Sequence, residues 1–561
     1  MARNIEIGKP RKFVRLLGAL AIAWGYSAQA LAEVMEVMVP MRDGAKLATN
    51  VFLPKGDGPW PVVLTRTPYN KGSAADREAA ETGYTDKGYV RIVQDCRGRF
   101  ASEGAYRAFI DDMDDGYDTV EWAARQSWSS GKVGMIGGSA MGITANHAAM
   151  SGAPHLVCNV VIVGHGSSYH YSGYPGGVFL KNLNEEWLRR QGVLPADVPR
   201  PIHRVYDDSF RTRDIQHYFA TMKTPTLNIG GWYDIFSQGN IDCFMGLQYH
   251  GAEPAKGNQK LVMGAFGHGK LAGDLKYPEN AGRLGADPDL SFRWFDHWLK
   301  GVDNGVERVP VVQYYVMGDT FDSAAPGNAW RTADHWPPKS DITPYYLHAG
   351  HKLSPDAPQA NASAAEAADS FVYDPKNPVP TVGGNNLMLP LGPMDQREVS
   401  IRGDVLKYET DPLTAAVEIA GPVAAELSVS TDAEDTDFTV KLVDVYPNGY
   451  EALVLDQAFR LRFREGFEKM VKAEKNKVYP IKVSLWSTAL AFNKGHKIAI
   501  HVSSSNSPRF EPHSNTWEPL ASYDQSVKAT NTVHHSAADA SRLMLPVTKV
   551  YSAPVPGAAG K

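Results

Sequence analysis

Nearly continuous apolar runs alternate with stretches of helical composition between residues 34 and 336. The apolar runs have the length of single strands and lie at 60–65, 88–94, 133–136, 156–163, 226–230 and 260–265. The stretches of helical composition lie at 74–86, 111–127, 143–150 and 289–299. Strands that are apolar along their whole length are typical of parallel sheets covered on both faces. The pattern therefore predicts a doubly wound α/β domain.

Further segments extend this domain or interrupt it. Residues 34–40 and 46–54 are predicted to pair as two strands around a turn at 42–44, and a last strand is expected at 309–317. Between residues 166 and 220 the alternation stops, because that segment is rich in aromatic side chains and its loops contain proline. We expect a helical cap there, inserted between the two parts of the α/β domain, 33–165 and 221–336.

After residue 336 the chain changes to short strands with alternating polar and apolar positions, about ten residues apart. Pro447-Asn448-Gly449 lies between two of these strands and is a strong hairpin signal. The spacing predicts a second, all-β domain over 337–553 with the architecture of a β-sandwich. Residues 356–369 are rich in alanine and serine and are expected to form a surface loop, and the tail from Ala553 is expected to be disordered.

The N-terminus has the three parts of a secretory signal peptide. Basic residues from Arg3 to Arg15 precede a short apolar segment at 16–24, and Ala30-Leu31-Ala32 supplies a cleavage site. We expect residues 1–32 to be removed and the mature protein to be periplasmic or secreted, with no membrane association afterwards. A retained membrane anchor is the alternative, and the short apolar run argues against it.

Charge and cysteine content exclude several classes of function. The net charge of −5 is too small to indicate nucleic acid or an anionic membrane as a partner. Three cysteines, Cys96, Cys158 and Cys243, are too few for a disulfide framework, so we expect buried free thiols, although one bridge is allowed. No residues have metal-ligand spacing, and we expect neither a metal nor another cofactor. The composition allows a homodimer without indicating one.

The stretch from Gly131 to Gly142 carries the first candidate chemistry. An apolar run leads into Gly137-Gly138-Ser139-Ala140-Met141-Gly142, and helical composition follows. A glycine-pinched serine between a strand and a helix indicates a nucleophile elbow, which presents the hydroxyl at a helix N-terminus. The usual pattern has a small residue where Met141 stands, and here the glycine comes one position later. Taken alone, such a stretch is more typical of an ordinary turn.

The order of the later strand ends favours catalysis. A nucleophilic serine needs a histidine to take its proton and a carboxylate to orient that histidine. In α/β-hydrolases these follow in the order serine, acid, histidine, each after a strand. Asp234 follows the run at 226–230, and His268 follows the run at 260–265 within a glycine-flanked loop. Individually Asp234 could cap a helix and His268 could lie on the surface, but jointly they predict a triad with Ser139.

The other histidines fit the role of base less well. His147 lies on the helix after the serine, His165 and His170 open the cap, and His297 lies inside a helix.

The negatively charged oxygen of the reaction intermediate needs two hydrogen-bond donors. The backbone N–H of Ala140, directly after the serine, is one. The second normally comes from the loop after the third strand, where Tyr69 stands. Its hydroxyl could donate, and an equally good interpretation from the residues alone is a packing aromatic.

Several motifs in the right order resemble one family. They are 66–69 (RTPY), 94–98 (QDCRG), 102–104 (SEG), 131–135 (GKVGM), 137–142 (GGSAMG), 231–234 (GWYD), 295–301 (FDHWLKG), 435–438 (DTDF) and 502–506 (VSSSN). The chain resembles the X-Pro dipeptidyl-peptidase-like (S15) family and, within it, the cocaine-esterase-like CocE/NonD hydrolases. The resemblance covers nearly the whole mature chain.

The resemblance implies an α/β-hydrolase domain with a helical cap and a C-terminal jelly-roll domain of the galactose-binding type. It implies Ser139 as nucleophile, Asp234 as orienting acid, His268 as base and Tyr69 as the second oxyanion donor. The late glycine at Gly142 is normal for this family, which removes the objection to the elbow.

Departures from the family pattern bear on the substrate. The family often has tyrosine where Ala140 stands, so the pocket wall shrinks here, and the cap is shorter than is common. Relatives that hydrolyse α-amino acid esters place carboxylates just after the orienting aspartate, whereas Asp234 is followed by Ile235-Phe236-Ser237. We therefore expect no preference for free α-amino substrates, because a buried ammonium without a counter-charge is costly.

That expectation holds unless a carboxylate of the cap reaches the site; the candidates are Glu185, Glu186 and Asp207. Phe236 is expected to form an apolar wall of the substrate pocket, together with Trp232 and Tyr169.

Three functions remain open from the sequence. The first is a secreted serine hydrolase that cleaves small carboxylic esters through an acyl-enzyme. The second uses the same triad as an X-Pro dipeptidyl-peptidase or an acyl-amide acylase, although the missing ammonium partner argues against the peptidase. The third is a catalytically silent carbohydrate-binding protein, since jelly-roll domains bind sugars.

Overall fold

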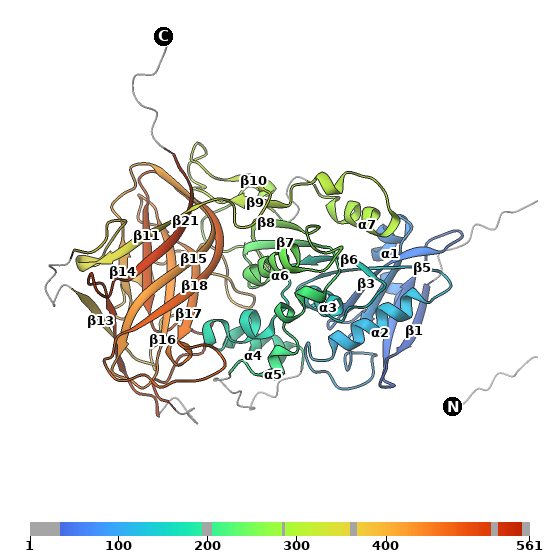
Figure 1. The fold of residues 1–561 in the computed structure, drawn as a ribbon, viewed down its shortest axis with the longest axis horizontal. Coiled ribbons are helices and arrows are strands. Elements are labelled where there is room, and N and C mark those ends of the chain that lie inside the picture. Colours follow the sequence, from blue (N-terminus) through green and yellow to red (C-terminus); the bar gives the residue numbers. More distant parts are fainter. Residues whose placement is uncertain (1–33, 193–204, 283–286, 360–366, 518–524, 552–561) are drawn as a thin grey trace, which may run out of the picture.

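The structure is a computed structural model that describes residues 34–192, 205–282, 287–359, 367–517 and 525–551. An α/β domain built around one sheet lies beside a domain built almost wholly of strands, and a small helical insertion lies at their junction (Figure 1). This arrangement confirms the predicted fold class of an α/β-hydrolase domain followed by an all-β domain.

A ten-stranded sheet forms the α/β domain, in the order β1-β2-β4-β3-β5-β6-β7-β8-β9-β10. The strands are β1 (Val34–Pro40), β2 (Lys46–Phe52), β3 (Trp60–Thr67), β4 (Val90–Asp95), β5 (Ser129–Gly138), β6 (Leu156–Ile162), β7 (Thr226–Tyr233), β8 (Lys260–Gly267), β9 (Val312–Val316) and β10 (Ala329–Ala333). Neighbouring strands from β4 to β9 are parallel. The pairs at the two edges are antiparallel.

Helices cover both faces of this sheet (Figure 1). They are α1 (Ala74–Thr85), α2 (Asp112–Ala124), α3 (Ala140–Met150), α6 (Ser237–His250) and α7 (Leu290–Lys300). On one face, Val120 of α2, Ala148 of α3 and Leu247 of α6 belong to one apolar cluster. On the other face, Trp294 and Phe295 of α7 pack into a second cluster. Covering both faces buries every central strand, which explains why their sequences are apolar throughout.

Two strands extend further toward their carboxyl ends than the apolar runs in the sequence predict. The run at 226–230 continues as β7 to Tyr233, and the run at 260–265 continues as β8 to Gly267. Asp234 and His268 therefore stand directly at the carboxyl ends of adjacent parallel strands, where ligands meet such sheets.

The segment between β6 and β7 is the helical insertion. It contains a π-helical turn at Ser168–Gly173, α4 (Lys181–Arg190) and α5 (Asp208–Arg211). Tyr169, Tyr174, Phe179 and Tyr206 are buried in an aromatic cluster of the insertion itself.

The second domain is mainly antiparallel. Its strands are β11 (Asp341–His348), β12 (Lys352–Ser354), β13 (Ala368–Tyr373), β14 (Leu406–Glu409), β15 (Ala416–Thr431), β16 (Asp437–Val445), β17 (Glu451–Arg460), β18 (Tyr479–Phe492), β19 (Lys497–Ser503), β20 (Ala529–His534) and β21 (Arg542–Tyr551); a short helix, α8 (Arg397–Ser400), precedes β14. The β16–β17 hairpin contains the predicted turn at 447–449.

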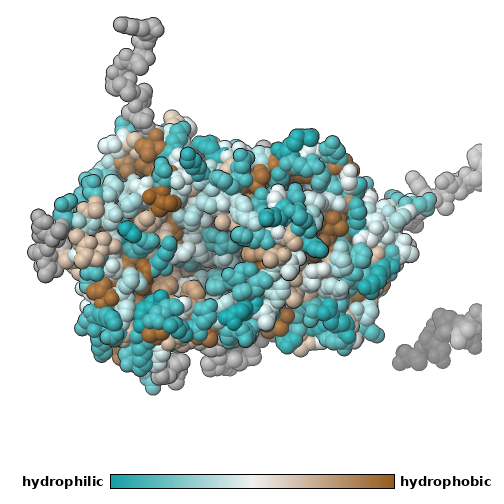
Figure 2. Space-filling view, in the orientation of Figure 1, coloured by the Kyte–Doolittle hydropathy of each residue, from teal (hydrophilic) through white to brown (hydrophobic). Residues whose placement is uncertain are grey.

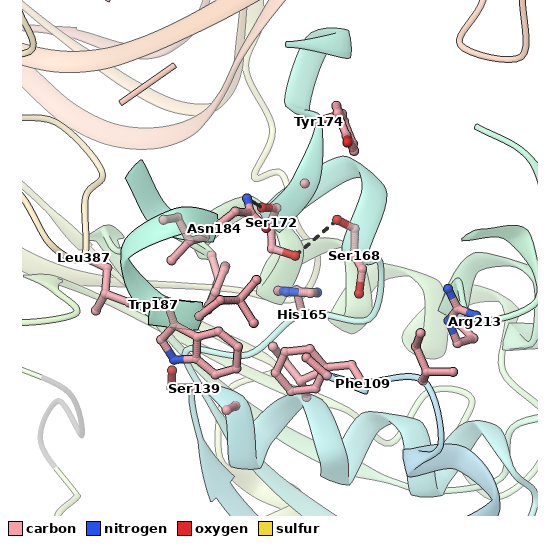
Figure 3. Close-up of a pocket in the computed structure, with 18 of the residues that line it drawn as sticks. Phe109, Ser139, His165, Ser168, Ser172, Tyr174, Asn184, Trp187, Arg213 and Leu387 are labelled. Atoms are coloured by element: carbon pink, nitrogen blue, oxygen red, sulfur yellow. Dashed lines mark hydrogen bonds between the residues drawn. The ribbon is translucent and has the colours of Figure 1, made fainter. Parts of the chain in front are cut away.

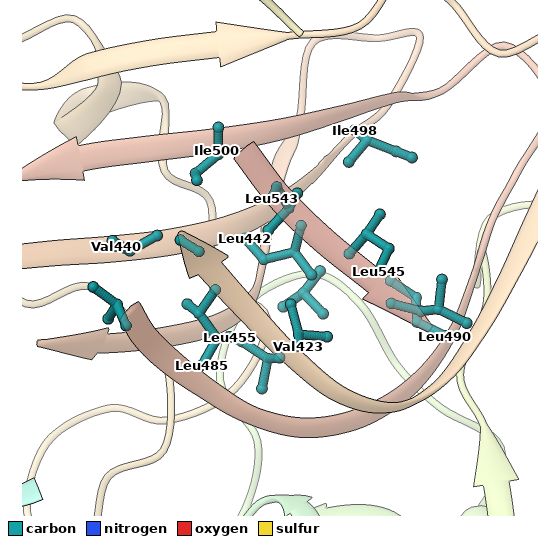
Figure 4. Close-up of a cluster of buried hydrophobic side chains, with 14 of the residues drawn as sticks. Val423, Val440, Leu442, Leu455, Leu485, Leu490, Ile498, Ile500, Leu543 and Leu545 are labelled. Atoms are coloured by element: carbon teal, nitrogen blue, oxygen red, sulfur yellow. The ribbon is translucent and has the colours of Figure 1, made fainter. Parts of the chain in front are cut away.

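Leucine, isoleucine and valine side chains fill the interior of this domain (Figure 4). Leu442 of β16, Leu455 of β17, Ile500 of β19 and Leu543 of β21 are each fully or almost fully buried there. Burial of a side chain of this size stabilises the fold by about 1.5–3 kcal/mol. The domain therefore has a substantial core of its own.

The two domains also share buried surface. Trp232 and Met263 of the ten-stranded sheet belong to the same apolar cluster as Leu347 of the second domain. The Tyr233 hydroxyl donates a hydrogen bond to the carbonyl oxygen of Leu453 at 3.0 Å. A common core of this kind fixes the second domain against the loops at the ends of β7 and β8.

Some predictions for the chain's ends and loops fall outside the described residues, whereas the structure does describe the three cysteines. The signal peptide at 1–32 and the tail from 553 lie outside the described residues, as does most of the loop predicted at 356–369. Within the described ranges, no helix has the length and apolar character needed to span a bilayer. The face in Figure 2 carries only scattered small groups of hydrophobic residues. Cys96, Cys158 and Cys243 are buried and unbridged, as expected.

Candidate active site

Ser139 occupies a strained turn between β5 and α3. Its backbone has φ 58° and ψ −127°, a conformation that residues with a side chain rarely adopt. The serine N–H donates to the carbonyl oxygen of Ile162 at 2.9 Å, and its own carbonyl oxygen accepts from Gly142 and Ile143 at 2.8 and 3.0 Å. Strain of this kind persists only where the surrounding structure holds it, and it is common at functional sites.

Because Gly137 has no side chain, the turn has room for the backbone of Met141. A Cβ atom on Gly137 would lie 2.2 Å from the carbonyl oxygen of Met141, which is closer than any real contact. A Cβ on Gly142 would lie 3.0 Å from the carbonyl oxygen of Gly137, whereas one on Gly138 would meet nothing closer than 3.7 Å. The elbow therefore needs glycine two positions before the serine, and the neighbouring glycine is not required for space.

Three residues far apart in the sequence meet at the ends of β5, β7 and β8. The Oγ atom of Ser139 lies 2.8 Å from Nε2 of His268. Nδ1 of the same ring lies 2.7 Å from Oδ2 of Asp234. The other carboxylate oxygen accepts the backbone N–H of Phe236 at 2.8 Å. With Nδ1 donating to the carboxylate, Nε2 is the acceptor for the serine proton.

The surroundings of Asp234 and His268 favour transfer of the serine proton to the imidazole. Asp234 is completely buried, and the His268 side chain is 10% exposed. A buried carboxylate interacts more strongly with the imidazole because little solvent screens the pair. The Phe236 ring packs edge-on against the His268 ring at 5.6 Å between centroids.

Tyr69, which the family resemblance implies as an oxyanion donor, lies beside Ser139 in the structure. Its hydroxyl oxygen accepts a hydrogen bond from the indole N–H of Trp187 at 3.0 Å. Burial raises the pKa of Tyr69, and hydrogen bonds with Trp187 and Ser139 only partly offset this effect. The phenol therefore stays protonated at neutral pH, and its O–H is available as a donor toward the serine.

Ala140 supplies the other predicted donor position. It is the first residue of α3, where a backbone N–H has no acceptor within the helix. Both Ala140 and Tyr69 line the same cavity as Ser139. The arrangement places a backbone N–H and a phenol O–H near the hydroxyl of Ser139.

A cavity of about 280 Å³ opens from Ser139 into the helical insertion (Figure 3). Its apolar lining comprises Phe109, Ile143, Leu183, Trp187, Phe236 and Leu387, among others. Ser168, Ser172 and Asn184 add polar groups, and Arg213 stands at the end away from Ser139 (Figure 3). Among the described residues that line the cavity, none is aspartate or glutamate.

Two of the three residues predicted for the pocket lie elsewhere. Phe236 lines the cavity, but Trp232 and Tyr169 do not. Trp232 points into the core between the domains, where its indole N–H donates to the carbonyl oxygen of Tyr315 at 2.7 Å. Tyr169 is fully buried inside the insertion and stacks on Tyr174 at 5.3 Å. Both predictions were wrong because side-chain direction at these positions depends on tertiary packing.

The carboxylates of the insertion do not reach the cavity either. Glu185 lies 4.0 Å from Lys181, and Glu186 pairs with Arg189 at 2.7 Å. The Asp207 side chain accepts the backbone N–H of Ser209 and caps the N-terminus of α5. None of these three carboxylates is therefore in a position to pair with a substrate ammonium.

Two other buried histidines are unsuited to act as the base. Burial lowers the pKa of His147 to about 4 and that of His165 to about 3, so both rings are neutral at physiological pH. His165 lines the cavity and packs edge-on against Phe236 at 4.6 Å. Within the described part of the chain, no cluster of histidine, cysteine or acidic residues could hold a metal ion.

Sequence reasoning missed Trp187, Phe109 and Leu387. Trp187 was visible as one of the aromatic residues of the insertion, but its bond to Tyr69 depends on how the insertion folds back. Leu387 comes from the second domain and carries no local signal.

Comparisons with known proteins agree with this architecture. Residues 43–205 and 189–270 match the model of the X-Pro dipeptidyl-peptidase (S15 family). Residues 304–544 match the X-Pro dipeptidyl-peptidase C-terminal non-catalytic domain.

The chain is 32% identical to the cocaine esterase of Rhodococcus sp. (strain MB1 Bresler), over 91% of this chain and 98% of that protein. An α-amino acid ester hydrolase structure superposes with a TM-score of 0.75 at 28% identity, covering 94% of this chain and 98% of that one. A CocE/NonD family hydrolase of Staphylococcus aureus has the same fold, with a TM-score of 0.71 at 20% identity, covering 92% of this chain and 94% of that one.

The two glycines before the serine give a matched prediction. Gly137→Ala places a methyl group against the Met141 carbonyl, so we expect a loss of stability of about 3 kcal/mol or more. Gly138→Ala, which meets only an ordinary contact, should lose less than about 1 kcal/mol. Denaturant unfolding of both variants beside wild type measures the difference. Equal stabilities of the two variants would contradict the account of the elbow.

Proposed function

The chain belongs to the X-Pro dipeptidyl-peptidase (S15) family, and on that basis we propose that Ser139, His268 and Asp234 form the catalytic triad of an esterase. The proposed reaction is hydrolysis of small carboxylic esters through an acyl-enzyme. The relatives make the chain a serine hydrolase. The observation that carries the finer assignment is the continuous hydrogen bonding from Ser139 through His268 to Asp234 at 2.8 and 2.7 Å.

Acylation begins when Oγ of Ser139 attacks the ester carbonyl while Nε2 of His268 takes the serine proton. Asp234 holds the ring and stabilises the imidazolium that forms. The carbonyl oxygen becomes an oxyanion, which the Ala140 N–H and the Tyr69 O–H stabilise. As the carbon–oxygen bond breaks, His268 gives its proton to the leaving alcohol.

Deacylation repeats the sequence with water. His268 removes a proton from water, the hydroxide attacks the acyl carbonyl, and the same two donors stabilise the second oxyanion. Collapse of this intermediate releases the carboxylic acid and returns the proton to Ser139.

The cavity supports a preference for uncharged acyl groups. Its walls near Ser139 are apolar, and the described residues of its lining include no carboxylate that could pair with an ammonium group. Binding a free α-amino substrate there would bury an uncompensated charge, which is costly. The structural neighbour named as an α-amino acid ester hydrolase is therefore expected to differ in this preference.

The family match supports one second candidate, hydrolysis of acyl amides. The same triad can protonate a leaving amine through His268. Removal of dipeptides from a free N-terminus is disfavoured, because it again requires a partner for the ammonium. A catalytically silent carbohydrate-binding protein would not need the aligned Ser139, His268 and Asp234.

Export and assembly complete the proposal. The signal-peptide pattern at 1–32 supports a mature enzyme outside the cytoplasm, periplasmic or secreted. A homodimer stays a prediction, as does the absence of nucleic-acid and membrane partners.

Ser139→Ala tests the function directly. Removal of the nucleophile should lower kcat/KM on p-nitrophenyl esters by at least about 10³-fold, with circular dichroism and melting temperature unchanged. A panel of a short ester, an acyl anilide and an X-Pro anilide on wild type should rank the ester first. Retained ester turnover in Ser139→Ala would refute the triad, and preference for the X-Pro anilide would reverse the choice of substrate.

Tyr69→Phe tests the second oxyanion donor. Loss of one donor should lower kcat by about 10²–10³-fold with little change in KM, because the bond forms mainly in the transition state. Tyr106→Phe is a matched control, since the Tyr106 hydroxyl is buried without a partner among the described residues. Equal kcat values for the two variants would exclude Tyr69 from the oxyanion site.

A further inference from the structure

Asn385 of the second domain holds the backbone of the loop that carries Asp234. Its side-chain Nδ2 donates to the carbonyl oxygens of Trp232 at 2.9 Å and of Asp234 at 2.8 Å. The same amide lies 3.3 Å from Oγ of Ser237. Asn385 is 1% exposed, so these bonds form in a dry environment where hydrogen bonds are strong.

The carbonyl groups that Asn385 binds lie at an irregular strand end. The β7–β8 register shifts between Gly231 and Tyr233, where Trp232 lies opposite two residues of β8, so the ladder is irregular two positions before Asp234. A register shift of this kind disrupts the ladder locally and leaves backbone groups without ladder partners. After the end of β7, the Asp234 N–H donates to the carbonyl oxygen of Gly231 at 3.0 Å, and the Asp234 carbonyl oxygen accepts the Ser237 N–H at 3.1 Å in a tight turn. Asn385 adds a donor from the second domain to the carbonyl groups of this turn.

The segment that presents Asn385 is itself rigid. We call it the 383–394 loop. Gly384 and Gly392 exchange two backbone hydrogen bonds at 2.9 and 3.0 Å across its base. The side chain of Asn386 spans the loop, donating to the carbonyl oxygens of Gly383 at 2.7 Å and Pro390 at 3.1 Å. Asn385 is therefore a fixed point relative to the second domain.

The base of the loop is anchored to the strands of the second domain. Gln396 donates to the carbonyl oxygens of Val382 and Met394 at 2.8 and 3.0 Å. Its side-chain oxygen accepts from Nζ of the buried Lys441 on β16 at 2.8 Å.

The same loop also contacts the segment that carries the base. The backbone N–H of Ala272, shortly after His268, donates to the carbonyl oxygen of Leu391 at 2.8 Å. Leu387 of the loop lines the cavity. One loop of the second domain thus contacts the acid segment, the base segment and the cavity wall.

We propose that Asn385 is a positioning residue for Asp234, through which a domain described in relatives as non-catalytic sets the geometry of the triad. This inference rests on the proposed function. Asn385 touches neither the carboxylate of Asp234 nor the reacting atoms. It acts by fixing the backbone on both sides of the Asp234 side chain, so that Oδ2 stays within 2.7 Å of His268. A displacement of about 1 Å in such a contact can cost about a hundredfold in rate.

Asn385→Leu keeps the approximate size of the side chain and removes its donors. We expect kcat for a p-nitrophenyl ester to fall about ten- to a hundredfold while KM changes less than about twofold. The acid limb of the pH profile of kcat/KM should move to lower pH. A carboxylate held less firmly stabilises the protonated imidazole less, so the free base persists to lower pH.

The shift of the acid limb separates positioning from a loss of folded protein. Partial unfolding lowers the whole profile without moving it, and titration with a fluorophosphonate probe counts the competent sites. Asn531→Leu is the matched control, because Asn531 is a buried amide that donates to Thr436 and Ser504 within the second domain. It should lose stability and keep both kcat per titrated site and the position of the acid limb.

Asn385→Ala provides the same test if the leucine variant does not fold. Unchanged kcat per site and an unmoved acid limb in the Asn385 variants would overturn the inference, as would equal effects in Asn531→Leu. These outcomes leave the proposed function intact when Ser139→Ala is inactive. Turnover that survives in Ser139→Ala refutes the proposed function itself.

Discussion

The imidazole of His268 must lie between a hydroxyl and a carboxylate, and this double hydrogen bond constrains most of the molecule. Ser139, Asp234 and His268 come from the ends of β5, β7 and β8, so the parallel sheet must bring these ends to one edge. The distances of 2.8 and 2.7 Å leave little tolerance. A positive φ at Ser139, a shift in the β7–β8 register before Asp234 and a buried, unscreened carboxylate are the local means by which the chain meets this constraint.

Sequence alone was sufficient for the elements that repeat a simple period. The apolar runs predicted the buried parallel strands because burial on both faces requires apolar residues at every position. Strand order then placed Ser139, Asp234 and His268 at one edge of the sheet. The family resemblance added Tyr69, which the residues alone left undecided.

The pocket could not be predicted in the same way. Trp232 stands two positions before Asp234 yet faces the core between the domains, and Tyr169 turns into the interior of the insertion. Leu387 and Asn385 reach the site from the second domain, more than one hundred residues after His268. No periodic pattern marks such positions, because their roles arise only when the insertion and the second domain fold back onto the sheet.

If the two domains form one catalytic unit with Ser139 as its single nucleophile, that serine must carry the acyl group during turnover, and rapid-quench mass spectrometry tests this most directly. Wild-type enzyme is mixed with p-nitrophenyl acetate, quenched in acid within the first turnover and digested. The predicted result is an acetyl group on the peptide that contains Ser139, at a stoichiometry that follows the initial release of p-nitrophenol. An acetyl group on another residue, or turnover without any covalent intermediate under conditions that trap deacylation, would contradict the account.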